Sequence, residues 1–356
     1  MNGMDSGRKN AYFAAANTED GFYSRFGALF NPSSGEWQKI YIIKGGPGTG
    51  KSGFMRRVAD AAEAHGYMTE RFYCSSDAAS LDGVRIPALG LALFDGTAPH
   101  TADPVYPGAV EEILNMGMFF DTERLRASLP EIRALQEENS AHHARARRFL
   151  HAAGAMRQTC RAFAHDAFLA QKAARAADRI VRACPAEREP VSDERLVTAI
   201  SVQGMVHLPT AELQGKCIYV PELGGRSTLL FAALAEAAER RGVSYVRYAS
   251  PLSPRETEGI FLPGTDTVYF TDRYGCAAAA AGRLNTARFF DAEITAGHRA
   301  AYRFAARCRE TLEEGACEAL AAAGAVHDRL EAHYIAAMDF DALNAFANRF
   351  LQRIFS

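Results

Sequence analysis

The sequence lacks long apolar runs and has no excess of charge of either sign. No stretch approaches about 18 uninterrupted apolar residues, so no membrane-spanning helix is expected. The 40 basic and 42 acidic residues give a net charge of −2, which argues against a generally basic nucleic-acid-binding protein. Because 48% of the 356 residues are hydrophobic, the chain can form two domains, each with its own core.

A secretory signal and paired cysteines are also missing. The polar start of the chain leads into no apolar segment typical of a signal peptide, which predicts a cytoplasmic protein. The seven cysteines form no CxxC pair and are expected to be reduced thiols, not a disulfide framework or a zinc site.

Two parts of the chain match each other at an offset of about 175 residues. Residues 52–66 and 227–242 both show the three- and four-residue apolar spacing of a helix, and both end at a glycine. A strand-like run follows each, and a glycine four residues before a proline then recurs at Gly83 and Gly259. The shared order of features predicts a duplication.

Each half divides into two parts. Strands alternate with helices up to about residues 120 and 290, which predicts a mainly parallel α/β sheet. Long helical segments rich in Ala, Arg and Glu follow at about 121–184 and 289–356. Two prolines and mixed charges at 184–192 mark the boundary, so the units are expected at 1–190 and 191–356.

A glycine-rich loop follows a strand-like run at residues 39–44. It reads GGPGTGKS, which fits G-x-x-x-x-G-K-[ST], and a helical pattern begins directly after it. Glycines let backbone N–H groups turn toward phosphate oxygens, and the helix adds its positive N-terminal end. Together with the repeat, the motif predicts two tandem P-loop NTPase-like units, with nucleotide phosphates bound in the first. The candidate nucleotide-binding residues are Gly45, Gly46, Pro47, Gly48, Thr49, Gly50, Lys51, Ser52 and Gly53.

Catalysis at this loop needs a cation for the phosphates and ligands for Mg²⁺. Lys51 is expected to reach the β/γ-phosphates, and the Ser52 hydroxyl is expected to ligate Mg²⁺. Asp95 ends the apolar run LALFD and is the second predicted Mg²⁺ ligand, although an Asp before Gly is also an ordinary turn former. Its counterpart in the second half, Thr271-Asp272, is shifted.

Further acidic residues and a histidine are candidates for proton transfer. Asp77 follows the strand after the P-loop helix, where strand ends face a ligand crevice, and is a candidate catalytic base. Asp82 is a second candidate, and capping a turn is the alternative for both. His100, with Asp103, lies in a segment rich in Pro and Gly, which indicates either an active-site loop or a structural histidine.

The second copy of the loop departs from the motif. Residues 220–228 read VPELGGRST, so that at a fixed offset Val220 stands where Gly45 stood and Arg226 replaces Lys51. The carboxylate of Glu222 is expected to repel phosphate. A decayed copy kept for packing is the favoured interpretation, and an altered second nucleotide site is the alternative.

Residues 141–184 carry nine basic and two acidic residues on predicted helices. A solvated helix face is the plain interpretation. The alternatives are a lid that offers an arginine to the γ-phosphate, and a patch for a polyanionic partner.

The chain resembles a bacterial family of tandem P-loop proteins that are labelled ATPase or ATP-binding. The resemblance rests on GGPGTGKS, CSSD, SLDGVRIP, DGTAPH and DPVYPGA, at residues 45–52, 74–77, 80–87, 95–100 and 103–109. It implies a two-copy P-loop fold that binds ATP, and it leaves the acceptor open.

These patterns predict ATP hydrolysis or phosphoryl transfer at the N-terminal loop, with Lys51, Asp77 and Asp95 as catalytic residues. The alternative is a nucleotide-gated interaction protein with slow or no turnover, whose C-terminal half is a partner surface. A nucleic-acid motor is disfavoured by the neutral charge and by the lack of helicase-type motifs. The expected partners are a nucleotide and an unidentified acceptor or protein, and no membrane.

Overall fold

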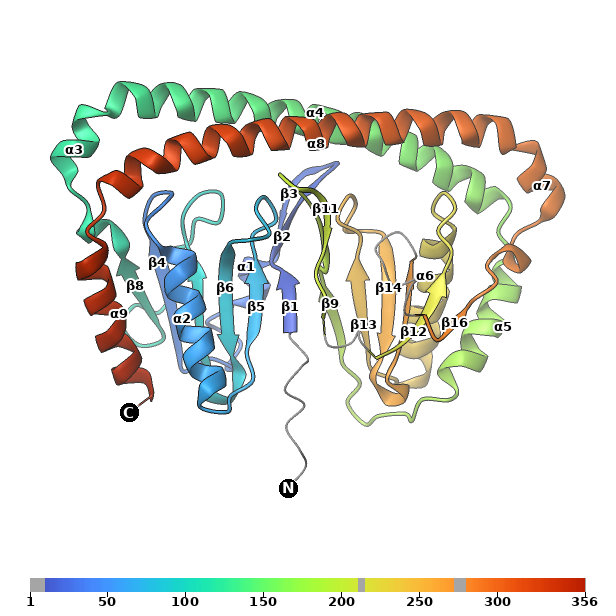
Figure 1. Cartoon of the computed structure of the whole chain (residues 1–356). Coiled ribbons are helices and arrows are strands. Elements are labelled where there is room, and N and C mark those ends of the chain that lie inside the picture. Colours follow the sequence, from blue (N-terminus) through green and yellow to red (C-terminus); the bar gives the residue numbers. More distant parts are fainter. Residues whose placement is uncertain (1–9, 211–214, 272–279, 356) are drawn as a thin grey trace.

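The computed structural model describes residues 10–210, 215–271 and 280–355. Two β-sheets stand side by side, and two long helices lie across one end of both sheets (Figure 1). The architecture is mixed α/β, as the sequence predicts. Within the described ranges, no helix is both long and apolar enough to cross a membrane.

The N-terminal sheet has the strand order β1-β5-β6-β7-β4-β8. β6 runs antiparallel to both of its neighbours, because the connections before and after it are too short to contain a crossover helix. The remaining pairs are parallel. The strands are β1 (Asn10–Phe13), β4 (Lys39–Lys44), β5 (Glu70–Tyr73), β6 (Leu81–Ile86), β7 (Leu91–Asp95) and β8 (Glu111–Asn115).

The C-terminal sheet repeats this arrangement. Its order β9-β13-β14-β15-β12-β16 matches the first sheet strand for strand, and β14 is again the antiparallel strand. This common order is the one that the internal repeat predicts. The strands are β9 (Ser192–Arg195), β12 (Lys216–Val220), β13 (Tyr245–Ala249), β14 (Thr257–Leu262), β15 (Thr267–Thr271) and β16 (Gly282–Arg283).

The two halves meet in the middle of the molecule. Phe13, at the end of β1, pairs with Leu196 just after β9, and its N–H donates to the Leu196 carbonyl at 2.8 Å. One buried cluster contains Phe72 from the first half together with Tyr248 and Phe270 from the second, so the halves share part of their core. Two hairpins lie between the sheets and the long helices: β2 (Ala15–Thr18) with β3 (Gly21–Ser24), and β10 (Thr198–Ser201) with β11 (Gly204–His207).

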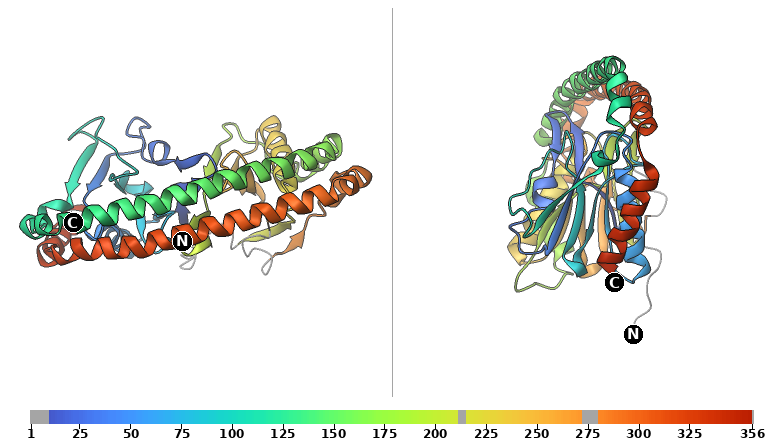
Figure 2. Two further views of the ribbon diagram at one scale, coloured as in Figure 1. Left: turned by 90° about the horizontal axis from the view of Figure 1, so that it is seen from above. Right: turned by 90° about the vertical axis from the view of Figure 1, so that its left-hand side faces the viewer.

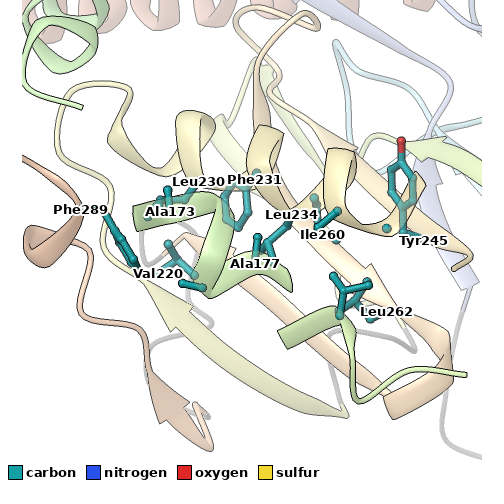
Figure 3. Packing of buried hydrophobic residues seen from close by; sticks show 14 of the residues in the cluster. Ala173, Ala177, Val220, Leu230, Phe231, Leu234, Tyr245, Ile260, Leu262 and Phe289 are labelled. Atoms are coloured by element: carbon teal, nitrogen blue, oxygen red, sulfur yellow. The ribbon is translucent and has the colours of Figure 1, made fainter. Parts of the chain in front are cut away.

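Helices α1 (Phe26–Leu29) and α2 (Lys51–Ala64) belong to the first half. Helix α2 buries Phe54, Met55 and Val58 against the strands, at the spacing of one helix face. In the second half, α6 (Arg226–Arg241) buries Phe231 and Leu234 in the same way, and Figure 3 shows these two side chains beside residues of the sheet and of α5 (Ala170–Val181).

Two long antiparallel helices, α4 (Leu129–Asp166) and α8 (Arg299–Ala336), join the halves. They pack against each other along the molecule, as the view from above shows (Figure 2). Buried alanines such as Ala146, Ala153, Ala316 and Ala323 lie on them, and small side chains let the helices approach closely. The remaining α-helices of the described residues are α3 (Thr122–Ala127), α7 (Ala292–Gly297) and α9 (Phe340–Phe355).

Each helical segment begins at one sheet and ends at the other. α4 leads to α5, which packs on α6 of the second half, while α8 leads to α9, which packs on α2 of the first (Figure 1). Equivalent hydrogen bonds join the start of each helical segment to the end of the other segment's long helix. The Asp121 N–H donates to the Ala337 carbonyl, and the Asp291 N–H donates to the Ala167 carbonyl, each at 2.7 Å. The terminal helices α5 and α9 are therefore exchanged between the halves.

Most of the described cysteines are free thiols: Cys74, Cys160, Cys184, Cys308 and Cys317. Cys217 is disulfide-bonded, so the expectation of reduced thiols is wrong for this residue. Cys276 lies outside the described residues.

Candidate functional site

The glycine-rich loop connects the end of β4 to the start of α2. Gly48 (φ 66°) and Gly50 (φ 77°) have left-handed backbone conformations, and Gly50 is the N-cap of α2. A side chain at Gly46 or Gly48 would also collide with α8, since a Cβ would lie 2.9 Å from Tyr334 Cε1 and 2.8 Å from Ile335 Cγ1, respectively. Local conformation and the covering helix both require glycine here.

Lys51 is the cation of this loop. Its Nζ donates to the carbonyls of Gly46 at 2.7 Å and Gly45 at 3.1 Å, and lies 3.5 Å from Asp95 Oδ2. Only 12% of the Lys51 side chain and 14% of the Asp95 side chain are exposed. The Lys51 ammonium group therefore lies within the loop, where it can form an ion pair with an anion that enters the loop.

Asp95 takes part in two interactions. Its Oδ1 accepts hydrogen bonds from the Thr97 N–H at 2.9 Å and the Thr97 hydroxyl at 2.5 Å, as a turn-capping Asp does. Its Oδ2 faces Lys51. Ser52, in the first turn of α2, accepts from the Leu81 N–H at 2.9 Å. These two predicted Mg²⁺ ligands therefore lie on neighbouring elements at the loop.

Asp77 is engaged as a turn cap. Its Oδ1 accepts from the Ala79 N–H at 3.0 Å and from Gln203 Nε2, in the second half, at 2.9 Å. Its negative charge also raises the pKa of His327 on α8, although the hydrogen bond of His327 to Glu331 is the largest cause of that shift. Asp77 thus contributes an acidic group beside the covering helix.

His100 lies in a closed environment beside the sheet. Its Nε2 is 3.3 Å from Oδ2 of the buried Asp82, and its ring stacks on Phe26 with centroids 4.2 Å apart. Burial, followed by the charge of Asp82, raises the pKa of Cys74 well above its usual value. The side chain of Asp103, a candidate from the sequence together with His100, is 93% exposed. These contacts favour the structural interpretation of His100.

The sequence prediction missed Glu331, which α8 brings to the loop. The Gly48 N–H donates to Glu331 Oε1 at 3.0 Å, and His327 Nε2 lies 3.5 Å from the same oxygen. The hydrogen bond to His327 lowers the pKa of Glu331, while burial opposes this effect. The second half has an equivalent contact, because Arg161 at the same position of α4 lies against Gly225 of the second loop, but the sequence alone does not show either contact.

The second loop is shorter than the first. Val220 pairs with Thr271 at the end of β12, as Ile43 pairs with Asp95 at the end of β4. The helix N-cap follows seven positions after Ile43 but only five after Val220. Val220 is therefore a strand residue, and its placement opposite Gly45 was wrong. Thr271 takes the position of Asp95, and Asp272 lies outside the described residues.

Glu222 fills the anion-binding part of the second loop. Its carboxylate accepts hydrogen bonds from the Gly225 N–H, from the Ser227 N–H at 3.2 Å and from the Ser227 hydroxyl. These donors therefore already have a carboxylate as their partner. The guanidinium of Arg226 lies 4.9 Å from the centroid of the Phe290 ring.

The basic residues of 141–184 separate into two groups. Most of them are exposed, as a solvated face requires. Arg157 and Arg161 instead bind Glu256 beside the second loop, at 2.5 Å and 3.1 Å. They line a pocket together with Glu222 and Arg309. The arginines at this end of the helices are therefore engaged by carboxylates.

Among the described residues, loop donors, one largely buried cation and two possible Mg²⁺ ligands come together only at the first loop. This arrangement can bind a polyphosphate. No protein-family model, no curated protein and no solved structure matches the chain.

Proposed function

We propose that the chain binds ATP with Mg²⁺ at residues 45–53 and hydrolyses it or transfers its γ-phosphoryl group. The observation that carries the proposal is the largely buried pair of Lys51 and Asp95 at a glycine loop that opens α2. Such a loop offers backbone N–H groups, a helix N-terminus and a cation to phosphate.

The residues present fit a magnesium nucleotide. Mg²⁺ is commonly bound by one or two protein ligands together with phosphates and water, and Ser52 and Asp95 supply a hydroxyl and a carboxylate. The metal would neutralise charge on the phosphates. Lys51 would orient them, and Asp77 would be released from Gln203 if it is to act as a base.

The second candidate function is a nucleotide-gated interaction protein. It is favoured by the direct contact of α8 with the loop, because α8 also reaches the opposite half. In this case the C-terminal half and the helices form the partner surface. For either function we propose a cytoplasmic location and no membrane partner.

Steady-state ATP turnover, measured with and without small hydroxyl and carboxylate acceptors, tests the proposal. Turnover stimulated by one acceptor supports phosphoryl transfer, and turnover without any acceptor supports hydrolysis. Nucleotide binding without turnover supports the gated protein. Absence of ATP binding in calorimetry would refute both functions.

Asp95→Asn is expected to lower Mg²⁺-dependent turnover by about 10- to 100-fold, because the amide keeps the bond to Thr97 but loses the ligand charge. ATP binding in EDTA should change much less. Turnover over a Mg²⁺ titration and binding with and without the metal measure the two effects. The exposed Asp103→Asn is the matched control. Equal losses with and without Mg²⁺ would show that Asp95 only caps the turn.

One nucleotide is expected per chain, because Glu222 occupies the second loop. Arg226→Ala should leave turnover nearly unchanged, since its side chain packs on Phe290. Calorimetric titration with a non-hydrolysable ATP analogue gives the stoichiometry. A value of two that falls to one in the Arg226 variant would instead establish a second nucleotide site.

A further inference from the structure

The C-terminal turns of α8 form a cover over the first loop. Tyr334 and Ile335 approach the backbone of Gly46 and Gly48 so closely that a Cβ on either glycine would force these side chains to shift. Beyond them, the Asp339 N–H donates to the Phe119 carbonyl at 2.9 Å and anchors the turn between α8 and α9 to the first half. The cover comes from the far end of the chain and is part of the loop's immediate surroundings.

Glu331 places a carboxylate on the loop itself. Its Oε1 accepts from the Gly48 N–H. The hydrogen bond to His327 is the main cause of the lowered pKa of Glu331, and the positive charge of Lys51 adds to it. An inward-turned loop amide of this kind is a donor for anions. The carboxylate therefore uses a donor that a phosphate oxygen would need.

The second loop provides an independent parallel. There, Glu222 accepts from two backbone N–H groups and a hydroxyl of the equivalent loop. Both loops thus carry an internal carboxylate, but the two carboxylates are attached differently. Glu222 belongs to its own loop, whereas Glu331 belongs to a helix that connects the halves.

We propose that Glu331 is an internal ligand that nucleotide phosphate displaces, so that the C-terminal turns of α8 are a nucleotide-responsive lid of the first loop. This inference rests on the proposed function. Release of Glu331 frees the Gly48 N–H for phosphate, and the contacts of Tyr334 and Ile335 with the loop must loosen as the lid moves. His327 lies on the same helix, one turn before Glu331, and moves with it.

Glu331→Gln is expected to bind a non-hydrolysable Mg²⁺–ATP analogue about tenfold more tightly than the wild type, because the charged acceptor that competes with phosphate is gone. Calorimetry on the full chain measures this. Glu318→Gln, at an exposed position of the same helix, is the matched control and should leave the affinity unchanged. Thermal unfolding of each variant verifies that it is folded.

Hydrogen exchange of the wild type gives a second readout that needs no variant. Adding the analogue should slow exchange of amides at 45–53 and speed exchange at 331–336. Equal affinities of the wild type and Glu331→Gln, with unchanged exchange at 331–336, would overturn the lid while leaving ATP binding intact. If neither protein binds the analogue, the proposed function itself fails.

Discussion

Replacing Lys51 by alanine is expected to weaken ATP binding by about 100-fold, equivalent to about 2.7 kcal/mol. The variant loses the cation that lies within the loop, and phosphate would enter against the remaining carboxylates, Asp95 and Glu331. Calorimetry with the non-hydrolysable analogue measures the loss, and turnover should fall with it.

The exposed Lys172→Ala on α5 is the matched control, because it removes one lysine and leaves the loop unchanged. Thermal unfolding of the Lys51 variant is needed as well, since the substitution also removes the partner of Asp95. A folded Lys51→Ala protein that bound ATP as the wild type does would show that the nucleotide site lies elsewhere.

The largest loss of stability is expected from Arg157→Met, at about 3–5 kcal/mol. The guanidinium of Arg157 on α4 donates to Glu256 Oε2 at 2.5 Å and lies 3.9 Å from Glu19 Oε2. Only 9% of the Arg157 side chain and 8% of the Glu256 side chain are exposed, so the variant leaves a buried carboxylate without its main partner. Urea unfolding measures the loss, and the exposed Arg145→Met on the same helix is the control.

The same pair predicts how stability depends on pH. Burial raises the pKa of Glu256, but Arg157 and then Arg161 more than offset burial, and the pKa in the folded protein lies below 4.5. The pair therefore stabilises the fold above about pH 4.5, and this contribution is lost as the pH falls through the lowered pKa. The difference in free energy of unfolding between the wild type and Arg157→Met should therefore decrease below that pH. A difference that stayed constant down to pH 3 would contradict the assignment.

Local features of the fold could be predicted from the sequence. The strand at 39–44, the glycine loop and α2 form one continuous segment, so the period of apolar residues and the glycine spacing contain the information. The repeated Gly–Pro spacing likewise predicted that both halves share one strand order.

The lid and the exchange of helices could not be predicted in this way. Glu331 lies 283 positions from Gly48, and the periodicity of a helix shows which face is buried without showing which sheet covers it. For the second loop, a fixed offset concealed a shortening by two positions, because only the pairing of Val220 with Thr271 reveals where the strand ends. Long-range partners and small deletions leave little trace in a single sequence.

The packing of α9 on α2 has a consequence for the order in which the protein is made. Phe54 of α2 meets Phe350 of α9 with ring centroids 5.1 Å apart, and Leu343 belongs to the same buried cluster. Translation supplies about 5–20 residues per second from the N-terminus. The apolar flank of α2 in the nascent N-terminal half therefore stays uncovered until residues 340–355 have left the ribosome.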